Sequence, residues 1–129
     1  MIDKKYFDPL AYWGKIRNLA VKLLLEAGIS VKTVTKIDEF TITFVAHSYL
    51  EYLFRAQKSF HREKVTMYWL RNVVQPDDVI YDIGANVGAY SLFAGHKVKS
   101  GGGQVYAFEP AFFNFSSLSR NIEANQDKE

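Results

Sequence analysis

The chain has 129 residues, of which 48% are hydrophobic and 16% aromatic, and it contains no cysteine. This length fits one small domain with a core of its own, and the composition excludes wholesale disorder. The lack of cysteine excludes disulfides, thiolate metal sites and a cysteine nucleophile. The formal net charge of +2 does not indicate a nucleic-acid partner, although residues 1–75 carry +5 and residues 76–129 carry −3.

The N-terminal residues predict neither a signal peptide nor a transmembrane helix. Residues 1–9 contain no uninterrupted apolar stretch. Charged residues interrupt the leucine-rich stretch that follows, which falls short of the roughly 20 apolar residues that a span needs. We therefore expect a cytoplasmic protein.

Residues 9–27 predict an amphipathic helix, with Pro9 in its first turn and Gly28 as its C-terminal stop. Its apolar residues at helical spacing are Trp13, Ile16, Ala20, Leu23, Leu24 and Ala27. We expect this face to pack against the domain. The alternative, favoured by Lys15, Arg17 and Lys22, is a helix that binds a membrane surface or a partner.

Residues 40–46 alternate apolar and polar side chains and are rich in β-branched residues, which predicts a strand. A short strand around residues 31–37 would complete a hairpin across Asp38 and Glu39. Residues 48–72 are expected to be mostly helical, most clearly over residues 63–72. There the apolar residues on or near one face are Val65, Tyr68, Trp69 and Val73.

The pattern changes after residue 75. Residues 79–83 predict a buried parallel strand, residues 84–88 a glycine-bearing loop and residues 89–98 a helix. Residues 100–103 predict a flexible turn, residues 104–108 a second buried strand, and residues 112–125 a helix. The apolar stripe of that last helix is expected to be Phe112, Phe115, Leu118 and Ile122. This βαβα order predicts an α/β fold with a parallel sheet, in which residues 1–74 form an N-terminal extension and residues 75–129 the start of a ligand-binding domain.

The first βα loop of such a unit commonly binds nucleotides. Asp82 ends the first strand, Gly84 and Gly88 permit tight turning, and Glu109 ends the second strand, where its carboxylate can accept bonds from ribose hydroxyls. The alternative is that the glycines serve the turn alone and that Glu109 is a surface acid. A dinucleotide fingerprint is excluded, because Asn86 and Ala89 stand where glycines are required, and no Walker loop occurs. A nucleoside without phosphates, such as S-adenosylmethionine, fits better.

The segment VIYDIGANVGAYSL at residues 79–92 resembles motif I of class I S-adenosylmethionine-dependent methyltransferases, in the form typical of the FkbM family. VYAFEP at residues 105–110, with Phe115, Leu118, Asn121 and Asn125 after it, resembles that family's next motif. Upstream, Arg55-Ala56, Arg62-Glu63, Thr66 and Trp69 resemble the stretch that often precedes motif I. Lys64 and Val65 depart from it, since Pro and Glu are common at those positions. The resemblance covers about residues 41–125.

The resemblance implies a doubly wound Rossmann-like sheet and an S-adenosylmethionine-dependent methyltransferase, with a hydroxyl of a small molecule, natural product or glycan as acceptor. It implies that Asp82 holds the cofactor's amino group and that Glu109 holds its ribose. The methionine part would be lined by Gly84, Ala85, Asn86 and Gly88, while Glu63 and Thr66 would close the pocket. No metal is expected, and no catalytic residue is assigned among His47, His61 and His96. The alternative function is a non-catalytic module that binds a partner or a membrane surface.

The resemblance implies a sheet of seven strands, whereas the pattern of residues 75–129 predicts only two. We therefore expect a fragment, or one half of a split protein, that binds S-adenosylmethionine weakly or not at all on its own. The unpaired edge of such a sheet would allow self-association.

Overall fold

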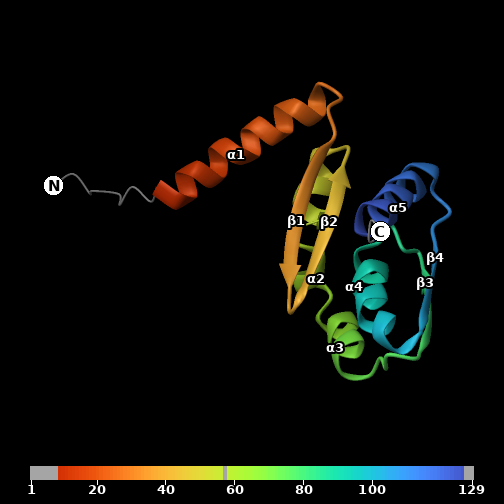
Figure 1. Ribbon diagram of the computed structural model, residues 1–129. Helices are drawn as coiled ribbons and strands as arrows, with labels where there is room; N and C mark the ends of the chain where they lie inside the picture. Colours follow the sequence, from red (N-terminus) through yellow and green to blue (C-terminus); the bar gives the residue numbers. More distant parts are fainter. Residues whose placement is uncertain (1–8, 57, 127–129) are drawn as a thin grey trace.

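The computed structural model describes residues 9–56 and 58–126 (Figure 1). The elements are α1 (Pro9–Glu26), β1 (Val31–Ile37), β2 (Phe40–Ala46), a π-helical segment η1 (Glu51–Ala56), α2 (Ser59–Arg62), α3 (Lys64–Asn72), β3 (Val79–Ile83), α4 (Ala89–Val98), a 3₁₀ turn η2 (Lys99–Gly101), β4 (Gln104–Phe108) and α5 (Phe112–Asn125). The predicted domain limits at residues 1 and 129 lie outside the described residues.

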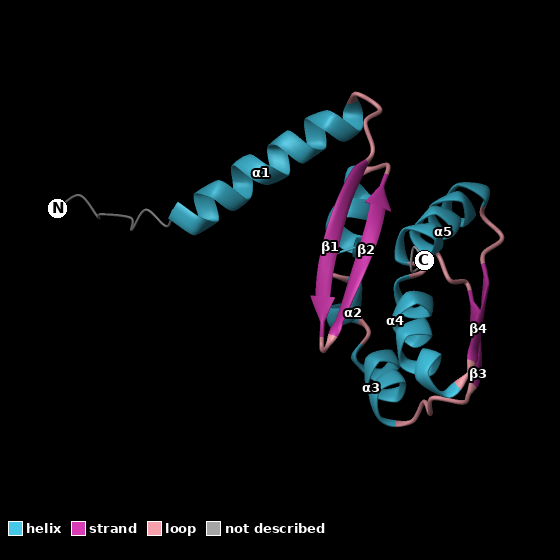
Figure 2. Ribbon diagram, in the orientation of Figure 1, coloured by secondary structure: helices cyan, strands magenta, loops and turns pink. Residues whose placement is uncertain are grey.

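Two small sheets enclose a helical layer, because α4 and α5 lie between the β1–β2 hairpin and the β3–β4 pair (Figures 1 and 2). The hairpin is antiparallel and runs from the Val31–Ala46 pair to the Ile37–Phe40 pair, across the predicted turn at Asp38 and Glu39. The β3–β4 pair is parallel, as the βαβα pattern predicts. The mixed α/β class is thereby confirmed, whereas a doubly wound sheet stays a prediction, because each sheet of the described residues has two strands.

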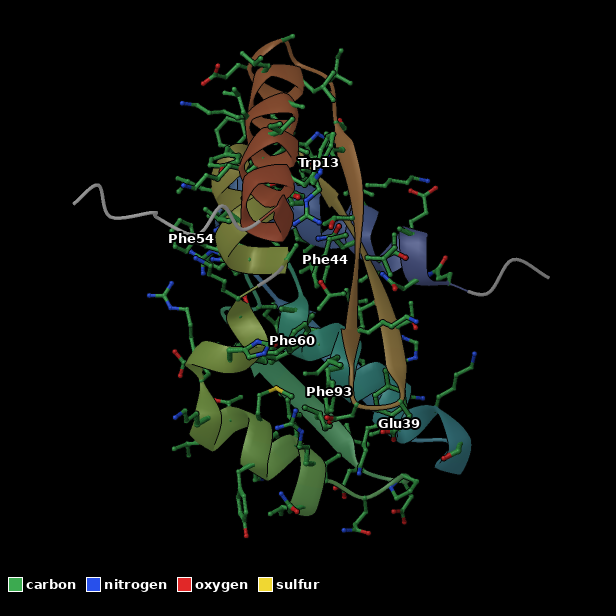
Figure 3. All side chains as sticks on the ribbon, turned by 90° about the vertical axis from the view of Figure 1, so that its left-hand side faces the viewer. Trp13, Glu39, Phe44, Phe54, Phe60 and Phe93 are labelled. Carbon is green, nitrogen blue, oxygen red and sulfur yellow. The ribbon has the colours of Figure 1, made fainter. Side chains whose placement is uncertain are left out.

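One hydrophobic core joins the residues before and after position 75. The ring centroid of Phe60 lies 6.4 Å from that of Phe44 in the hairpin and 6.2 Å from that of Phe93 in α4 (Figure 3). Around these rings the core contains Ile42, Ala56, Met67, Leu70, Val74, Ile80, Val87, Ala89, Leu92, Ala94 and Val98. The predicted division at residue 75 therefore separates segments of the chain that share one core.

Side-chain amides of α5 pair with the backbone of β2, which lies beside that helix. Asn125 accepts the N–H of Thr43 at 2.9 Å and donates to the carbonyl of the same residue at 2.7 Å. Asn121 is buried; it accepts the N–H of Val45 at 2.7 Å and donates to the carbonyl of Val87 at 2.8 Å. These bonds satisfy the edge of β2 much as another strand would.

Helix α3 packs with a face different from the predicted one. Val65 and Tyr68 are 83% and 66% exposed, while Met67 and Leu70 are buried together with Val74, just beyond the helix. Positions 67, 70 and 74 also follow helical spacing, so this segment has two apolar stripes. The stripe of Met67, Leu70 and Val74 is the one that packs in the core. The predicted stripe of Val65, Tyr68, Trp69 and Val73 is therefore wrong.

The predicted stripe of α5 is wrong for a related reason. Of its four residues only Leu118 is buried, whereas Phe112, Phe115 and Ile122 are exposed. The helix instead turns the polar Asn121 inward, because that side chain supplies hydrogen bonds to β2 and to the loop after β3.

The strands β3 and β4 are covered on one face, by α4 and α5 (Figure 1). The other face exposes Val79, Tyr81, Ile83, Tyr106 and Phe108. Tyr81 stacks there on both Tyr106 and Phe108. The predicted burial of these two strands therefore holds on one face and is wrong on the other, for the part of the chain that the structure describes.

Helix α1 begins and ends almost where predicted, but its predicted packing face is wrong. Trp13, Ile16, Leu23 and Leu24 are all exposed, and α1 projects from the end of the hairpin (Figure 1). Val21 and Leu25 contact the body instead. None of the helices within residues 9–56 and 58–126 combines the length and apolar character needed to cross a membrane.

Candidate functional site

The loop after β3 is held against the end of β4. The amides of Gly84 and Ala85 both donate to the carbonyl of Phe108, at 2.8 and 2.9 Å. Gly84 (φ +84°), Asn86 (φ +54°) and Gly88 (φ +85°) all adopt left-handed conformations. Glycine and asparagine are the residues that tolerate this region best, so the sequence of the loop matches its shape.

Glu109 links this loop to the segment that follows β4. One carboxylate oxygen accepts the amide of Asn86 at 2.8 Å, and the other accepts the amide of Ala111 at 2.8 Å. The hydrogen bond from Ala111, followed by those from Asn86 and the Asn114 side chain, lowers the pKa of Glu109 below its ordinary value. Glu109 is therefore an ionised group held in place by backbone donors at the end of the parallel pair.

The far end of the loop is packed rather than open. A Cβ at Gly88 would lie 2.5 Å from the Cδ1 atom of Leu118, so any other residue here would force the buried Leu118 side chain of α5 to move. The carbonyl of Val87 next to it accepts the bond from Asn121. Ala85 and Gly88 are both buried. The second half of the loop is consequently fixed by α5.

Asp82 lies at the C-terminal end of β3 and is partly buried. It accepts a hydrogen bond of 2.5 Å from the hydroxyl of Ser91, in the first turn of α4. This bond uses one of its oxygens and leaves the rest of its acceptor capacity for other donors.

A cleft of about 760 Å³ opens between the η1–α3 region and the end of β3. Its lining combines Leu50, Phe54, Arg55, Ser59, Arg62, Glu63 and Thr66 from before residue 75 with Asp82, Ile83, Gly84 and Tyr90 from after it. Beside Gly84 there is open space where other residues carry a Cβ. The cleft is thus built jointly by the segments on either side of residue 75.

The cleft contains both signs of charge. Arg55 and Arg62 supply two cations, and Glu63 and Asp82 supply two carboxylates. The Tyr90 hydroxyl donates to the carbonyl of Ser59 at 2.9 Å. Burial, followed by the charge of Glu63, raises the pKa of Tyr90, so its hydroxyl stays protonated near neutral pH. Such a site suits a ligand that carries an ammonium and a carboxylate together.

The structure gathers some of the predicted site residues and not others. Asp82, Gly84, Glu63 and Thr66 line the cleft together. Ala85 and Gly88 are buried inside the loop, while Asn86 and Glu109 bond to each other at its edge. The cofactor-binding role of all eight residues stays a prediction.

Arg55, Arg62, Phe54 and Tyr90 were not singled out as site residues from the sequence. The two arginines belong to the stretch that resembles the region before motif I, which was the available signal. Nothing in the local pattern distinguishes Phe54 or Tyr90 from core aromatic residues.

Two of the three histidines, His47 and His96, contact neighbouring side chains. His96 stacks on Phe40 with ring centroids 5.2 Å apart, and burial lowers its pKa. His47 lies within hydrogen-bonding distance of Ser30 and Arg120. Within residues 9–56 and 58–126 there is no group of three histidine or acidic side chains arranged to hold a metal ion.

Part of the chain is similar to a known methyltransferase. A stretch of 55 residues, 41% of this chain, is 44% identical to the 31-O-demethyl-FK506 methyltransferase FkbM of Streptomyces tacrolimicus. The match covers 20% of that protein, so the chain spans about a fifth of the length of this relative. No family model and no solved structure matches the chain. The comparisons thus indicate a partial relationship to a methyltransferase, carried by less than half of the chain.

Proposed function

We propose that the cleft at the end of β3 binds S-adenosylmethionine, and that the chain contributes this site to a methyltransferase. The observation that carries the proposal is the convergence of Asp82, Gly84, Glu63 and Thr66 on one cleft. These residues come from two segments, and each segment resembles a methyltransferase motif. The partial identity to a named methyltransferase supports the same reading.

The residues of the cleft fit the chemical groups of this cofactor. Asp82 and Glu63 can accept hydrogen bonds from its ammonium, and Arg55 and Arg62 can donate to its carboxylate. Each oxygen of Glu109 accepts one amide, and an ionised carboxylate has acceptor sites for about four donors. Because the Asn114 side chain donates to Glu109 as well, capacity remains for one ribose hydroxyl, while Gly84 lets a ligand approach the backbone.

The cofactor supplies an electrophilic methyl group when it is bound. The chain's own contribution is to orient that group and to exclude water, because positioning lowers the barrier of an in-line displacement. Tyr90 stays protonated and bonded to the Ser59 carbonyl, so it fixes α4 against α2 rather than accepting a proton. We propose a hydroxyl of a natural product or sugar as the acceptor, in line with the demethylated hydroxyl substrate in the relative's name.

Photocrosslinking with radiolabelled S-adenosylmethionine tests this function. The wild-type chain should be labelled, with label on peptides that contain residues 59–66 or 82–91. Asp82→Ala and Glu109→Ala should each reduce labelling at least about tenfold, because each removes a charge-assisted contact. Asp77→Ala, which removes an exposed acid from the turn before β3, is the matched control and should label like wild type. Equal labelling of all three variants would overturn the proposal.

A further inference from the structure

Helix α1 carries two separate apolar faces. Val21 and Leu25, four residues apart, pack against Ala46, Tyr49 and Tyr52 of the body. Ile16 and Leu23 lie about half a turn around the helix from them, since successive residues are about 100° apart. The attachment of α1 to the body thus leaves its second face uncovered.

The uncovered face is large and continuous. Trp13 is 66% exposed, Leu19 and Leu23 are each 58% exposed, and Ile16 and Leu24 are 41% and 42% exposed. Their spacing of three, four and seven residues aligns them along one side of the helix. The projection of α1 away from the hairpin keeps this side clear of the other described elements (Figure 1). Contiguous apolar surface of this kind marks an interaction site.

Cations border this face on both sides. Arg17 lies on one flank, next to Trp13 and Leu24, and Lys15 and Lys22 lie on the other, next to Leu19 and Leu23. The acid Glu26 is 3.7 Å from Lys22 and forms an i,i+4 pair with it at the attached end of the helix. Within the described residues of α1, Glu26 is the only acid, so the part of the helix around Trp13, Lys15 and Arg17 combines apolar side chains with positive charge.

We propose that α1 lies in the plane of a bilayer surface that contains anionic phospholipids, with Ile16, Leu23 and Leu24 immersed among the acyl chains and Trp13 at the level of the headgroups. An interfacial helix needs an apolar side, flanking lysines and arginines, and an aromatic residue at the headgroup level, and α1 has each. Both flanks are basic, so an anionic surface is complementary to both at once. A second copy of α1 would instead bring like charges together along both flanks.

Vesicle binding of the full chain tests the proposal, with Trp69→Phe as the parent so that Trp13 is its sole tryptophan. Vesicles with about 30% phosphatidylserine should shift Trp13 emission to the blue, and brominated lipids should quench it. Raising the salt from about 0.1 M to about 1 M should weaken binding, because the screening length falls from about 10 to 3 Å. Vesicles of phosphatidylcholine alone should bind much less.

Two double variants distinguish membrane binding through α1 from a general attraction of the positively charged protein to anionic vesicles. Lys15→Glu with Arg17→Glu should lower the partition coefficient at least about 20-fold, since each basic residue at such a surface contributes about fivefold. Lys32→Glu with Lys36→Glu makes the same change of charge at exposed positions of β1 and should bind within about threefold of the parent. An equal loss in both variants would overturn the proposal.

Replacement of apolar residues by serine tests whether the apolar face of α1 enters the bilayer. Leu23→Ser with Leu24→Ser should abolish quenching of Trp13, whereas Val65→Ser with Tyr68→Ser, on the exposed side of α3, should leave it unchanged. Sedimentation velocity without lipid should show a monomer. A dimer with Trp13 emission already blue-shifted would show that a second copy covers this face, and would contradict the proposal, as would undetectable binding to the anionic vesicles.

Discussion

At the residue scale, two polar side chains tie together segments that lie far apart in the sequence. The carboxylate of Glu109 joins the loop after β3 to the start of α5. The amide of Asn121 joins α5 to β2 and to the same loop. The shape of the candidate site therefore depends on hydrogen bonds that α5 and the end of β4 supply.

The ionisation of Glu109 makes the loop sensitive to acid. Because Ala111 and Asn86 lower the folded-state pKa of Glu109, its contribution to stability is present above the unfolded-state pKa and is lost as the pH falls through the folded-state value. Carboxyl NMR titration should place the pKa of Glu109 below the ordinary value of a glutamate, because of the hydrogen bond from Ala111 and that from Asn86. In urea unfolding between pH 6 and pH 3, Glu109→Gln should lose less stability than wild type. An unshifted pKa together with identical pH profiles would refute this.

Loss of the Asn121 amide should destabilise the protein substantially. Asn121→Ala leaves the N–H of Val45 and the carbonyl of Val87 without these partners in a part-buried and a buried site. Unsatisfied buried groups cost about 1–3 kcal/mol each, so we expect about 2–4 kcal/mol of lost stability in urea unfolding. Asn72→Ala removes an exposed amide bonded to the Tyr68 carbonyl and should cost less than about 0.5 kcal/mol. Similar losses in both variants would contradict this role.

At the scale of elements, the start of α4 depends on the fit between Gly88 and α5. Gly88→Ala would place a Cβ 2.5 Å from Leu118 at a positive φ, and we expect a loss of about 2–3 kcal/mol. Gly95→Ala, in the interior of the same helix with nothing within 4 Å of the new Cβ, should stabilise the protein by about 0.5–1 kcal/mol. Thermal unfolding of the two variants measures the difference. Effects of the same sign would show that the packing at Gly88 is not as described.

The sequence predicts the first and last residues of these helices and strands better than it predicts which face of each helix is buried. The strands at residues 31–37, 40–46, 79–83 and 104–108 and the helices at residues 89–98 and 112–125 are confirmed at the predicted residues. Alternation, turn residues and glycines are local signals, and they suffice for such limits. Which face of a helix is buried depends on distant residues. For that reason Met67 and Asn121 were missed, while the exposed Val65 and Phe112 were assigned to packed faces.

At the scale of the whole molecule, the shared core predicts coupled unfolding of the segments before and after residue 75. Phe60→Leu should lower stability by about 1–2 kcal/mol, because Phe60 contacts the rings of both Phe44 and Phe93. Hydrogen exchange should then accelerate equally in β2 and α4. Phe113→Leu, at a position 82% exposed, should change stability by less than about 0.5 kcal/mol. Faster exchange confined to residues before position 75 would show two independent units.

The candidate site is predictable only in part, because some of its residues are brought together by contacts between distant parts of the sequence. Asp82, Gly84 and Glu109 could be placed from the strand ends and the loop that follows them. The contributions of Arg55 and Tyr90 required the η1–α3 region to fold over the end of β3, which no local pattern specifies. The resemblance to a methyltransferase motif predicts Glu63 and Thr66 as site residues, and both line the same cleft as Asp82.

An NMR titration of the ¹⁵N-labelled chain with millimolar S-adenosylmethionine tests directly whether this cleft binds the cofactor. We predict saturable amide shifts concentrated at Glu63, Thr66 and residues 82–86, strongly reduced in Asp82→Asn and unchanged in the control Asp77→Asn. Weak binding is sufficient for this result, since such shifts remain measurable for millimolar dissociation constants. The absence of saturable shifts, or shifts confined to residues outside the cleft, would show that the cleft is not the cofactor site.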